Sequence, residues 1–178
     1  KLFSFLNLGK QPLCDDLSIK PEDSIFYKLE IKFCKICLTA YQKYNIEKKT
    51  VFPKEYHYRS ANTNDVLLGM KDLVKNVEMI KGNLKNRIVL DVGCNDGSLL
   101  DIFKKKGCKT YGIEPTNAFK DAKGKGHTIY NQYFDIKSSL YLKKNMKDVD
   151  IITFTNVFAH IDEFKDLIQS LKNLITKN

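Results

Sequence analysis

The chain has 178 residues, of which 43% are hydrophobic and 29% are charged, and 30 basic against 21 acidic residues give it a formal net charge of +9. These values are typical of a globular protein and argue against disorder. The sequence has no apolar run of about 18 residues and no N-terminal signal arrangement, so we expect neither a membrane span nor a secretory signal.

The positive charge does not indicate a nucleic-acid partner. Residues 1–60 carry 11 basic and 7 acidic residues, and residues 61–178 carry 19 and 14, so the excess is spread along the chain. Only Arg59 and Arg87 are arginines, whereas nucleic-acid recognition makes heavy use of the guanidinium group. We therefore expect no nucleic acid among the partners.

The first 60 residues form a predicted β-rich domain interrupted by turns. Tyr27, Leu29, Ile31 and Phe33 alternate with charged residues, which is the pattern of a half-buried strand. Further turn residues occur before and after this strand. The strand leads directly into a Cys-x-x-Cys pair.

That pair, Cys34 and Cys37, belongs to a set of five cysteines. An odd number with one close pair favours reduced thiols and a cytoplasmic location over a disulfide framework. A structural zinc ion normally takes four ligands. The other candidates show no pairing at ligand spacing, so a zinc site, a redox pair and a purely structural pair all remain open; these candidates are Cys14, His57, Cys108 and His127.

Residues 63–81 have helical spacing. Their apolar side chains share one stripe, Thr63 or Asn64 is the expected N-cap, and Gly82 is the expected end. We expect the 61–84 region to connect the N-terminal domain to a second one.

From residue 85 to residue 178 strands and helices alternate. Such an alternation predicts an α/β fold, a Rossmann-like, doubly wound parallel sheet. The predicted strands are 88–92, 110–113, 128–130 and 150–155, and the predicted helices are 98–106, 117–123 and 164–175.

The turn after the first of these strands is the most informative stretch. It reads Asp91-x-Gly93-x-x-x-Gly97 and also contains Asp96. A dinucleotide site expects Gly-x-Gly-x-x-Gly facing a pyrophosphate, which two acids would repel. A nicotinamide-dependent dehydrogenase is therefore disfavoured, and a cofactor with a cationic amine and a sulfonium is favoured. Glu114, at the end of the next strand, is suited to accept hydrogen bonds from both ribose hydroxyls.

With these motifs, residues 87–178 resemble the class I S-adenosylmethionine-dependent methyltransferases. The resemblance implies that the 91–97 loop contacts the methionine part, Glu114 the ribose, and Phe134 the adenine, with Thr155 and Asn156 facing the methionine or the acceptor. Cys94 reads as a small packing residue of the loop rather than a nucleophile. The cofactor-binding set is Asp91, Gly93, Cys94, Asn95, Gly97, Glu114, Pro115, Phe134, Thr155 and Asn156.

The N-terminal part resembles the zinc-binding domain of the sugar C-methyltransferases. The resemblance rests on Asn-Leu-Gly-x-x-Pro-Leu at 7–13, on Cys34 and Cys37, and on Tyr-x-Tyr-x-Ser at 56–60. That family has another Cys-x-x-Cys before the first of these motifs, which this sequence lacks. Structural zinc at Cys34 and Cys37 is therefore expected only if the full-length protein contains that pair.

The same resemblance extends to the Asn156-x-x-x-His160 segment. It implies that His160 is catalytic, with Tyr58 directed to the same site and Tyr56 as second choice. Without the resemblance, His160 is equally a structural histidine and the tyrosines are equally packing residues. The family's Glu-His segment, a source of the base, lies outside this sequence, and its sheet is larger than the four strands predicted here, so we expect a fragment.

The expected function is therefore the S-adenosylmethionine-dependent C-methylation of a small molecule, a nucleotide-activated keto-sugar of bacterial surface-polysaccharide or natural-product biosynthesis. Two alternatives stay open. One is an O- or N-methyltransferase of another polysaccharide precursor, and the other is a non-enzymatic zinc-ribbon interaction module.

Overall fold

The computed structural model describes residues 2–13, 17–146 and 148–175. Contacts between residues divide the chain into unit 1, Lys1–Pro53, and unit 2, Lys54–Asn178. The division lies a few residues before residue 60, where the sequence analysis placed the end of the N-terminal domain. Residues 54–62 account for this shift, because their hydrogen-bond partners belong to unit 2.

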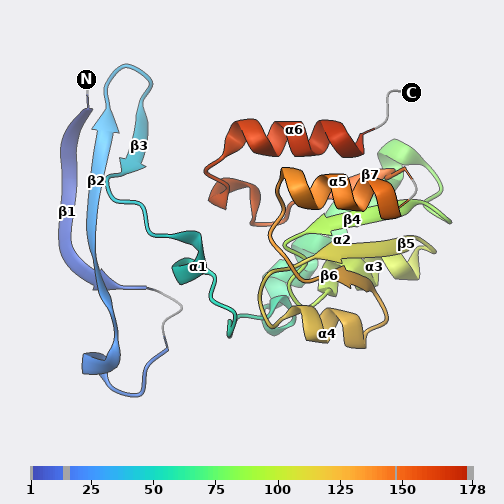
Figure 1. Ribbon diagram of the computed structural model, residues 1–178, viewed down its shortest axis with the longest axis horizontal. Helices are drawn as coiled ribbons and strands as arrows, with labels where there is room; N and C mark the ends of the chain where they lie inside the picture. The colour runs from blue at the N-terminus through green and yellow to red at the C-terminus, as the bar shows by residue number, and fades with distance from the viewer. Residues whose placement is uncertain (1, 14–16, 147, 176–178) are drawn as a thin grey trace. The chain divides into compact units, whose positions relative to one another are not determined.

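Unit 1 is built on a three-stranded antiparallel sheet in the order β1-β2-β3 (Figure 1). Its elements are β1 (Leu2–Pro12), the short 3-10 helix η1 (Pro21–Asp23), β2 (Phe26–Cys34), β3 (Thr39–Gln42) and α1 (Lys48–Val51). The strand predicted at residues 27–33 is confirmed within β2. β1 continues through the 7–12 region, where the sequence predicted turns. The strand stays paired with β2 there because its register shifts between Asn7 and Lys10.

Aromatic rings and a buried carboxylate hold this small sheet together. Phe33 on β2 contacts the rings of Phe3 and Phe5, with centroids 5.8 and 6.1 Å apart. Glu30 is 8% exposed, and its carboxylate accepts hydrogen bonds from Ser4 at 2.9 Å and from Lys43 at 2.6 Å. The ion pair with Lys43 lowers the pKa of Glu30.

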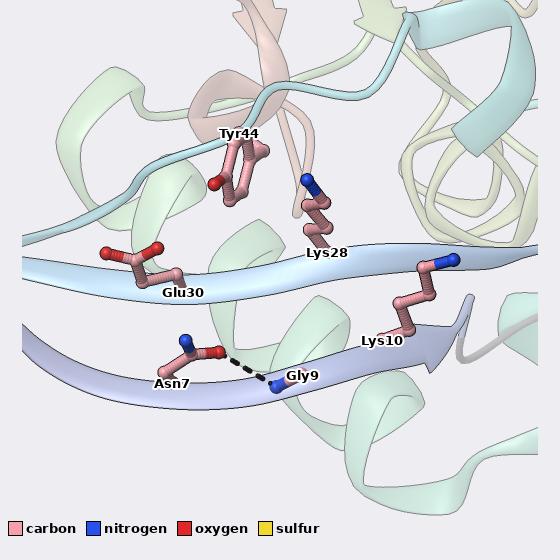
Figure 2. Close-up of a pocket in the computed structure, with 6 residues that line it drawn as sticks. All are labelled: Asn7, Gly9, Lys10, Lys28, Glu30 and Tyr44. Carbon is pink, nitrogen blue, oxygen red and sulfur yellow. Dashed lines mark hydrogen bonds between the residues drawn. The ribbon is translucent and has the colours of Figure 1, made fainter.

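A hollow of about 260 Å³ lies beside the register shift of β1 (Figure 2). Within it, Asn7 Oδ1 accepts a hydrogen bond from the backbone N–H of Gly9. No residue of the predicted catalytic, cofactor or metal sets lines it. The lining residues are Asn7, Gly9, Lys10, Lys28, Glu30 and Tyr44.

Unit 2 contains a four-stranded parallel sheet in the order β6-β5-β4-β7. The strands are β4 (Ile88–Val92), β5 (Lys109–Ile113), β6 (Thr128–Tyr130) and β7 (Ile151–Thr153). Asp91 on the central strand pairs with Gly112 on one side and with Thr153 on the other. The predicted Rossmann-like parallel sheet is confirmed, and Asp91 and Glu114 lie at the carboxyl ends of its two inner strands.

Helices cover both faces of this sheet (Figure 1). Val89 belongs to the core under α2 and α3, and its neighbour Leu90 belongs to the core under α5 and α6, as expected for alternating side chains of a strand buried on both faces. The helical elements are η2 (Ser60–Asn62), α2 (Asn64–Lys81), α3 (Ser98–Lys105), α4 (Phe119–Gly124), α5 (Ile136–Asn145), η3 (Phe158–His160) and α6 (Phe164–Leu174).

Most predicted elements of unit 2 are present, with two differences. The predicted strand 150–155 is shorter, because the chain leaves the sheet after Thr153 and reaches a left-handed residue, Asn156, at a φ of 56°. Helix α5 was not predicted; a capping box of Asp135 and Ser138 starts it. No helix among the described residues is long and apolar enough to cross a bilayer.

Candidate functional site

The turn from β4 to α3 forms the centre of the site. Gly93, Asn95 and Gly97 have φ values of 70°, 49° and 78°, a left-handed region that costs other residues free energy. The backbone N–H of Gly93 donates to Ile113 O on β5 at 2.8 Å, and that of Gly97 donates to Cys94 O at 2.9 Å. The turn is therefore fixed by its own backbone and by the neighbouring strand.

Packing also requires the two glycines. A Cβ at Gly93 would collide with the Val157 side chain, which follows β7. A Cβ at Gly97 would lie 2.9 Å from Ala122 Cβ and 2.9 Å from His127 Cδ2. The segment after β7 thus lies directly against the turn.

Asp91 is a buried carboxyl group just before this turn. It is 2% exposed, and its Oδ1 accepts a hydrogen bond from Thr153 Oγ1 at 2.7 Å. Burial raises the pKa of Asp91 to about 7, and the nearby charge of Glu114 adds to the effect, although the Thr153 hydrogen bond opposes it. A cation bound nearby would stabilise the ionised form of this group.

Glu114 lies at the end of β5 and is 5% exposed. Its Oε2 accepts the backbone N–H of Asn95 at 3.0 Å, and its Oε1 accepts the N–H and the hydroxyl of Thr116 at 2.8 and 2.6 Å. A carboxylate offers about four acceptor positions, so capacity for a further donor remains. These contacts hold the carboxylate beside the glycine turn.

Phe134 starts a row of aromatic rings. Its ring meets Phe154 edge to face at 5.8 Å, Phe154 meets Phe158 at 5.9 Å, and Phe158 meets Phe164 at 5.8 Å. The row joins the loop before α5 to the segment after β7. Phe134, to which sequence analysis gave the adenine, is thus in a continuous row of rings with Phe158, two residues before His160.

Cys94 packs inside the turn. It is 3% exposed, and its Sγ fills the space that a Cβ at Gly112 would need. Burial is the main cause that raises the pKa of the Cys94 thiol far above its usual range. The thiol therefore stays protonated, as a packing residue would.

Three residues of the predicted site, Thr155, Asn156 and His160, lie after β7. The Thr155 hydroxyl oxygen is buried and has no hydrogen-bond partner among the described residues. A buried hydroxyl without a partner is costly, so this atom is suited to meet a polar ligand. Asn156 is exposed, and His160, at the end of η3, is also exposed.

The 54–62 segment was only partly singled out in the sequence. Tyr58, which is 38% exposed, lies in it, and its ring centroid is 6.4 Å from that of Tyr56. Asn95 Nδ2 donates to the Tyr58 carbonyl oxygen at 3.2 Å. Tyr58 therefore belongs to unit 2 and is anchored on the glycine turn. Arg59 was missed because two of its side-chain partners, Asn117 and Asp121, lie about 60 residues away in the sequence.

The described residues do not support a zinc site in unit 1. Among them, no group of three or more His, Cys, Asp or Glu side chains is placed to hold a metal ion. Cys34 ends β2, and Cys37 follows in the turn to β3, so the described residues of unit 1 offer two thiols where four ligands are needed. A hydrogen bond with Tyr41 is the main cause that lowers the pKa of Cys37 to about 7. Cys14 lies outside the described residues.

Comparisons with known proteins agree on one class. A family model described as "Methyltransferase domain" matches residues 67–178. The C-methyltransferase NovU of Streptomyces niveus is 20% identical over 174 residues, which cover 96% of this chain and 41% of that protein. The chain therefore spans about two fifths of the length of this relative.

Two solved structures are also similar. One is a crystal structure of magnesium protoporphyrin IX methyltransferase from Synechocystis PCC 6803 with bound SAM, at 23% identity and a TM-score of 0.47; the match covers 60% of this chain and 53% of that one. The other is a SAM-dependent methyltransferase from Archaeoglobus fulgidus, at 22% identity and a TM-score of 0.42, with 58% and 46% covered.

Proposed function

The chain belongs to the methyltransferase-domain family, and from that membership we propose that unit 2 binds S-adenosylmethionine and takes part in methyl transfer to a small-molecule acceptor. The observation that carries the proposal is the pair of buried carboxyl groups, Asp91 and Glu114, on either side of one left-handed turn. Carboxylates at this edge of a parallel sheet suit a ligand with a ribose and a cationic group.

The residues present fit this cofactor. Glu114 keeps acceptor capacity beyond the three hydrogen bonds it receives, and Asp91 has a raised pKa that a cation would lower. Thr155 offers a buried hydroxyl without a partner among the described residues. We assign the ribose to Glu114 and Pro115, the methionine part to the 91–97 loop and Thr155, and the adenine to Phe134.

The cofactor supplies an electrophilic methyl group, and methyl transfer also requires residues that align the acceptor and a base that removes its proton. We propose Tyr58 and His160 for acceptor contact. Support comes from their anchoring, because the Tyr58 carbonyl is held by Asn95 and the segment that leads to His160 packs on Gly93 through Val157. Asn156, next to Thr155, completes this side of the site.

We further propose that the acceptor is a nucleotide-linked keto-sugar that is methylated on carbon. The NovU match supports this, because it runs through both units and not only through the cofactor-binding part. Removal of a proton next to a ketone creates an enolate, which requires a base and hydrogen-bond donors such as histidine and tyrosine supply. The net charge of +9 would attract a phosphorylated acceptor.

Incubation of the full-length protein with methyl-labelled S-adenosylmethionine and a set of nucleotide-linked keto-sugars tests this assignment. We expect label on a carbon next to the ketone, located by NMR of the product. Label found only on oxygen or nitrogen would overturn carbon methylation and favour an O- or N-methyltransferase of a related precursor. Tyr58→Phe and His160→Ala should each lower the rate while cofactor affinity is retained.

Two finer points belong to the same proposal. Structural zinc at Cys34 and Cys37 would require two further ligands from outside the described residues, and metal analysis of the full-length protein measures it. A cytoplasmic location fits the free thiols at Cys34, Cys37, Cys94 and Cys108.

A further inference from the structure

Asn95 connects the cofactor side of the glycine turn to the 54–62 segment. Its backbone N–H donates to Glu114 Oε2 at 3.0 Å. Its side chain faces the other way: Oδ1 accepts the N–H of Ser60 at 3.0 Å, and Nδ2 donates to the carbonyl oxygen of Tyr58 at 3.2 Å. One residue thus contacts the carboxylate proposed for the ribose and the backbone that carries Tyr58.

The left-handed backbone of Asn95 makes this double contact possible. At a φ of 49°, its backbone N–H bonds to Glu114 while its side-chain amide bonds to Ser60 and Tyr58. Asparagine is among the few residues that adopt this conformation at modest cost, and it offers both a donor and an acceptor. The next residue adds to the connection, because Asp96 Oδ2 accepts the N–H of Ala61 at 2.9 Å.

Arg59 holds the 54–62 segment in one conformation. Its Nη1 donates to the carbonyl oxygens of Tyr56 and Tyr58 at 2.6 and 2.9 Å, its Nη2 donates to Asn117 Oδ1 at 3.3 Å, and its Nε donates to Asp121 Oδ2. A planar guanidinium satisfies several partners at once, which lysine does not. The segment is therefore braced between α4 and the glycine turn.

We propose that Asn95 is a positioning residue that couples cofactor binding at Glu114 to the placement of Tyr58, with Arg59 as the brace of the coupled segment. This inference rests on the proposed function. A ligand on Glu114 stabilises the arrangement in which the Asn95 N–H bonds to that carboxylate. The same arrangement holds Ser60 and Tyr58, so opening of the segment is opposed when the cofactor is bound.

Hydrogen exchange with S-adenosylhomocysteine as the probe tests the coupling. The amides to follow are those of Tyr56 and Ala61, whose acceptors are Asn117 and Asp96, so that neither bond is made by Asn95 itself. If opening requires release of the ligand, a concentration of 100 times Kd slows their exchange by about 100-fold. Amides of β4 report the change in global stability in the same experiment.

Asn95→Gly is the decisive variant, because glycine accepts the left-handed backbone while the side-chain contacts disappear. Compared at the same multiple of its own Kd, this variant should lose the slowing at Tyr56 and Ala61. Asn86→Gly is the matched control. Asn86 is also left-handed, at a φ of 67°, but it is exposed and precedes β4, so the slowing should persist.

Arg59→Lys provides a second route that leaves the glycine turn intact. We expect faster exchange at Tyr56 and a smaller slowing by the probe. Calorimetry on the same samples separates the outcomes. Binding heat with unchanged exchange at Tyr56 and Ala61, or full slowing in Asn95→Gly, overturns the coupling alone. Absence of binding heat in the unmodified protein overturns the proposed function and the coupling with it.

Discussion

Asp91 is the residue whose environment departs furthest from that of an ordinary carboxyl group. The sequence marks it as an acid near the end of an otherwise apolar strand, and the structure adds that it is buried, bonded to Thr153 and close to Glu114. Its pKa of about 7, against an ordinary value of 3.8, means that the protein without ligand is most stable with this group protonated.

This raised pKa predicts how stability depends on pH. Between the ordinary pKa and the folded-state pKa, the folded protein binds a proton that the unfolded chain has lost, so the contribution of Asp91 to stability falls as pH rises. Asp91→Asn removes this loss. The difference in free energy of unfolding between the variant and the unmodified protein should grow from pH 4 to pH 7, by up to about 1.4 kcal/mol per pH unit.

Urea titrations at several pH values measure that difference. Ser139→Ala serves as the control and should show no such trend, because this buried hydroxyl bonds to Ile136 O and Asn173 Nδ2, which do not titrate. A constant difference between Asp91→Asn and the unmodified protein at all pH values would show that Asp91 is not protonated in the folded state near pH 7.

Residue identity alone did not reveal the role of Asn95 and Arg59. Both residues lie in motifs that sequence analysis quoted, but their partners are distant in sequence: Asn95 bonds to Ser60 and Tyr58, and Arg59 bonds to Asp121. Side-chain hydrogen bonds between remote segments leave no periodic pattern. The carboxylates were predictable because each lies at the carboxyl end of a recognisable strand, Asp91 in β4 and Glu114 just after β5.

At the scale of elements, the glycine turn depends on backbone conformation and packing together. Gly97 has a φ of 78°, and a Cβ there would lie 2.9 Å from both Ala122 and His127. Gly69, in the interior of α2, has no atom within 4 Å of its Cβ position. The two positions therefore predict opposite effects of the same substitution.

Gly97→Ala should lower the free energy of unfolding by about 3 kcal/mol, from the left-handed backbone and the crowding. Gly69→Ala should raise it by up to about 1 kcal/mol, because alanine loses less conformational entropy in a helix. Denaturant unfolding measures both. If Gly97→Ala were as stable as the unmodified protein, the packing of α4 and His127 against the turn would be wrong.

Strong periodicity decided which elements were predictable. Strand β4 is buried throughout and apolar except for Asp91, and α2 has one apolar stripe that ends at Gly82, with a φ of 73°. Helix α5 was missed because two of its three buried residues are serines, Ser138 and Ser139, so its buried face carries little apolar signal. Its capping box was the signal that would have identified it.

At the scale of the molecule, the division into units assigns the 54–62 segment to unit 2. Resemblance to a family placed this segment with the N-terminal domain, since its motif follows that domain in the sequence. The hydrogen bonds of Ser60, Ala61 and Tyr56 with residues of unit 2 explain the difference. Charge and composition do not reveal to which unit the 54–62 segment belongs.

Two shortened chains test the assignment. We expect residues 54–178 alone to unfold cooperatively and to bind S-adenosylhomocysteine as the longer chain does. Residues 63–178, which lack the segment, should be less stable by about 2–4 kcal/mol, since several hydrogen bonds at about 1 kcal/mol each are lost. Denaturant unfolding and calorimetry provide the readouts. Equal stability of the two shortened chains would contradict the structural role of the segment.

Calorimetric titration of the protein with S-adenosylhomocysteine tests the central claim most directly, with Glu114→Gln as the matched variant and NAD as the competing ligand. The variant keeps the size of the side chain but loses the charge that strengthens hydrogen bonds to a ribose. We predict binding with one ligand per chain, an affinity reduced by about 10-fold or more in the variant, and no heat with NAD. Heat with NAD and none with S-adenosylhomocysteine would contradict the account.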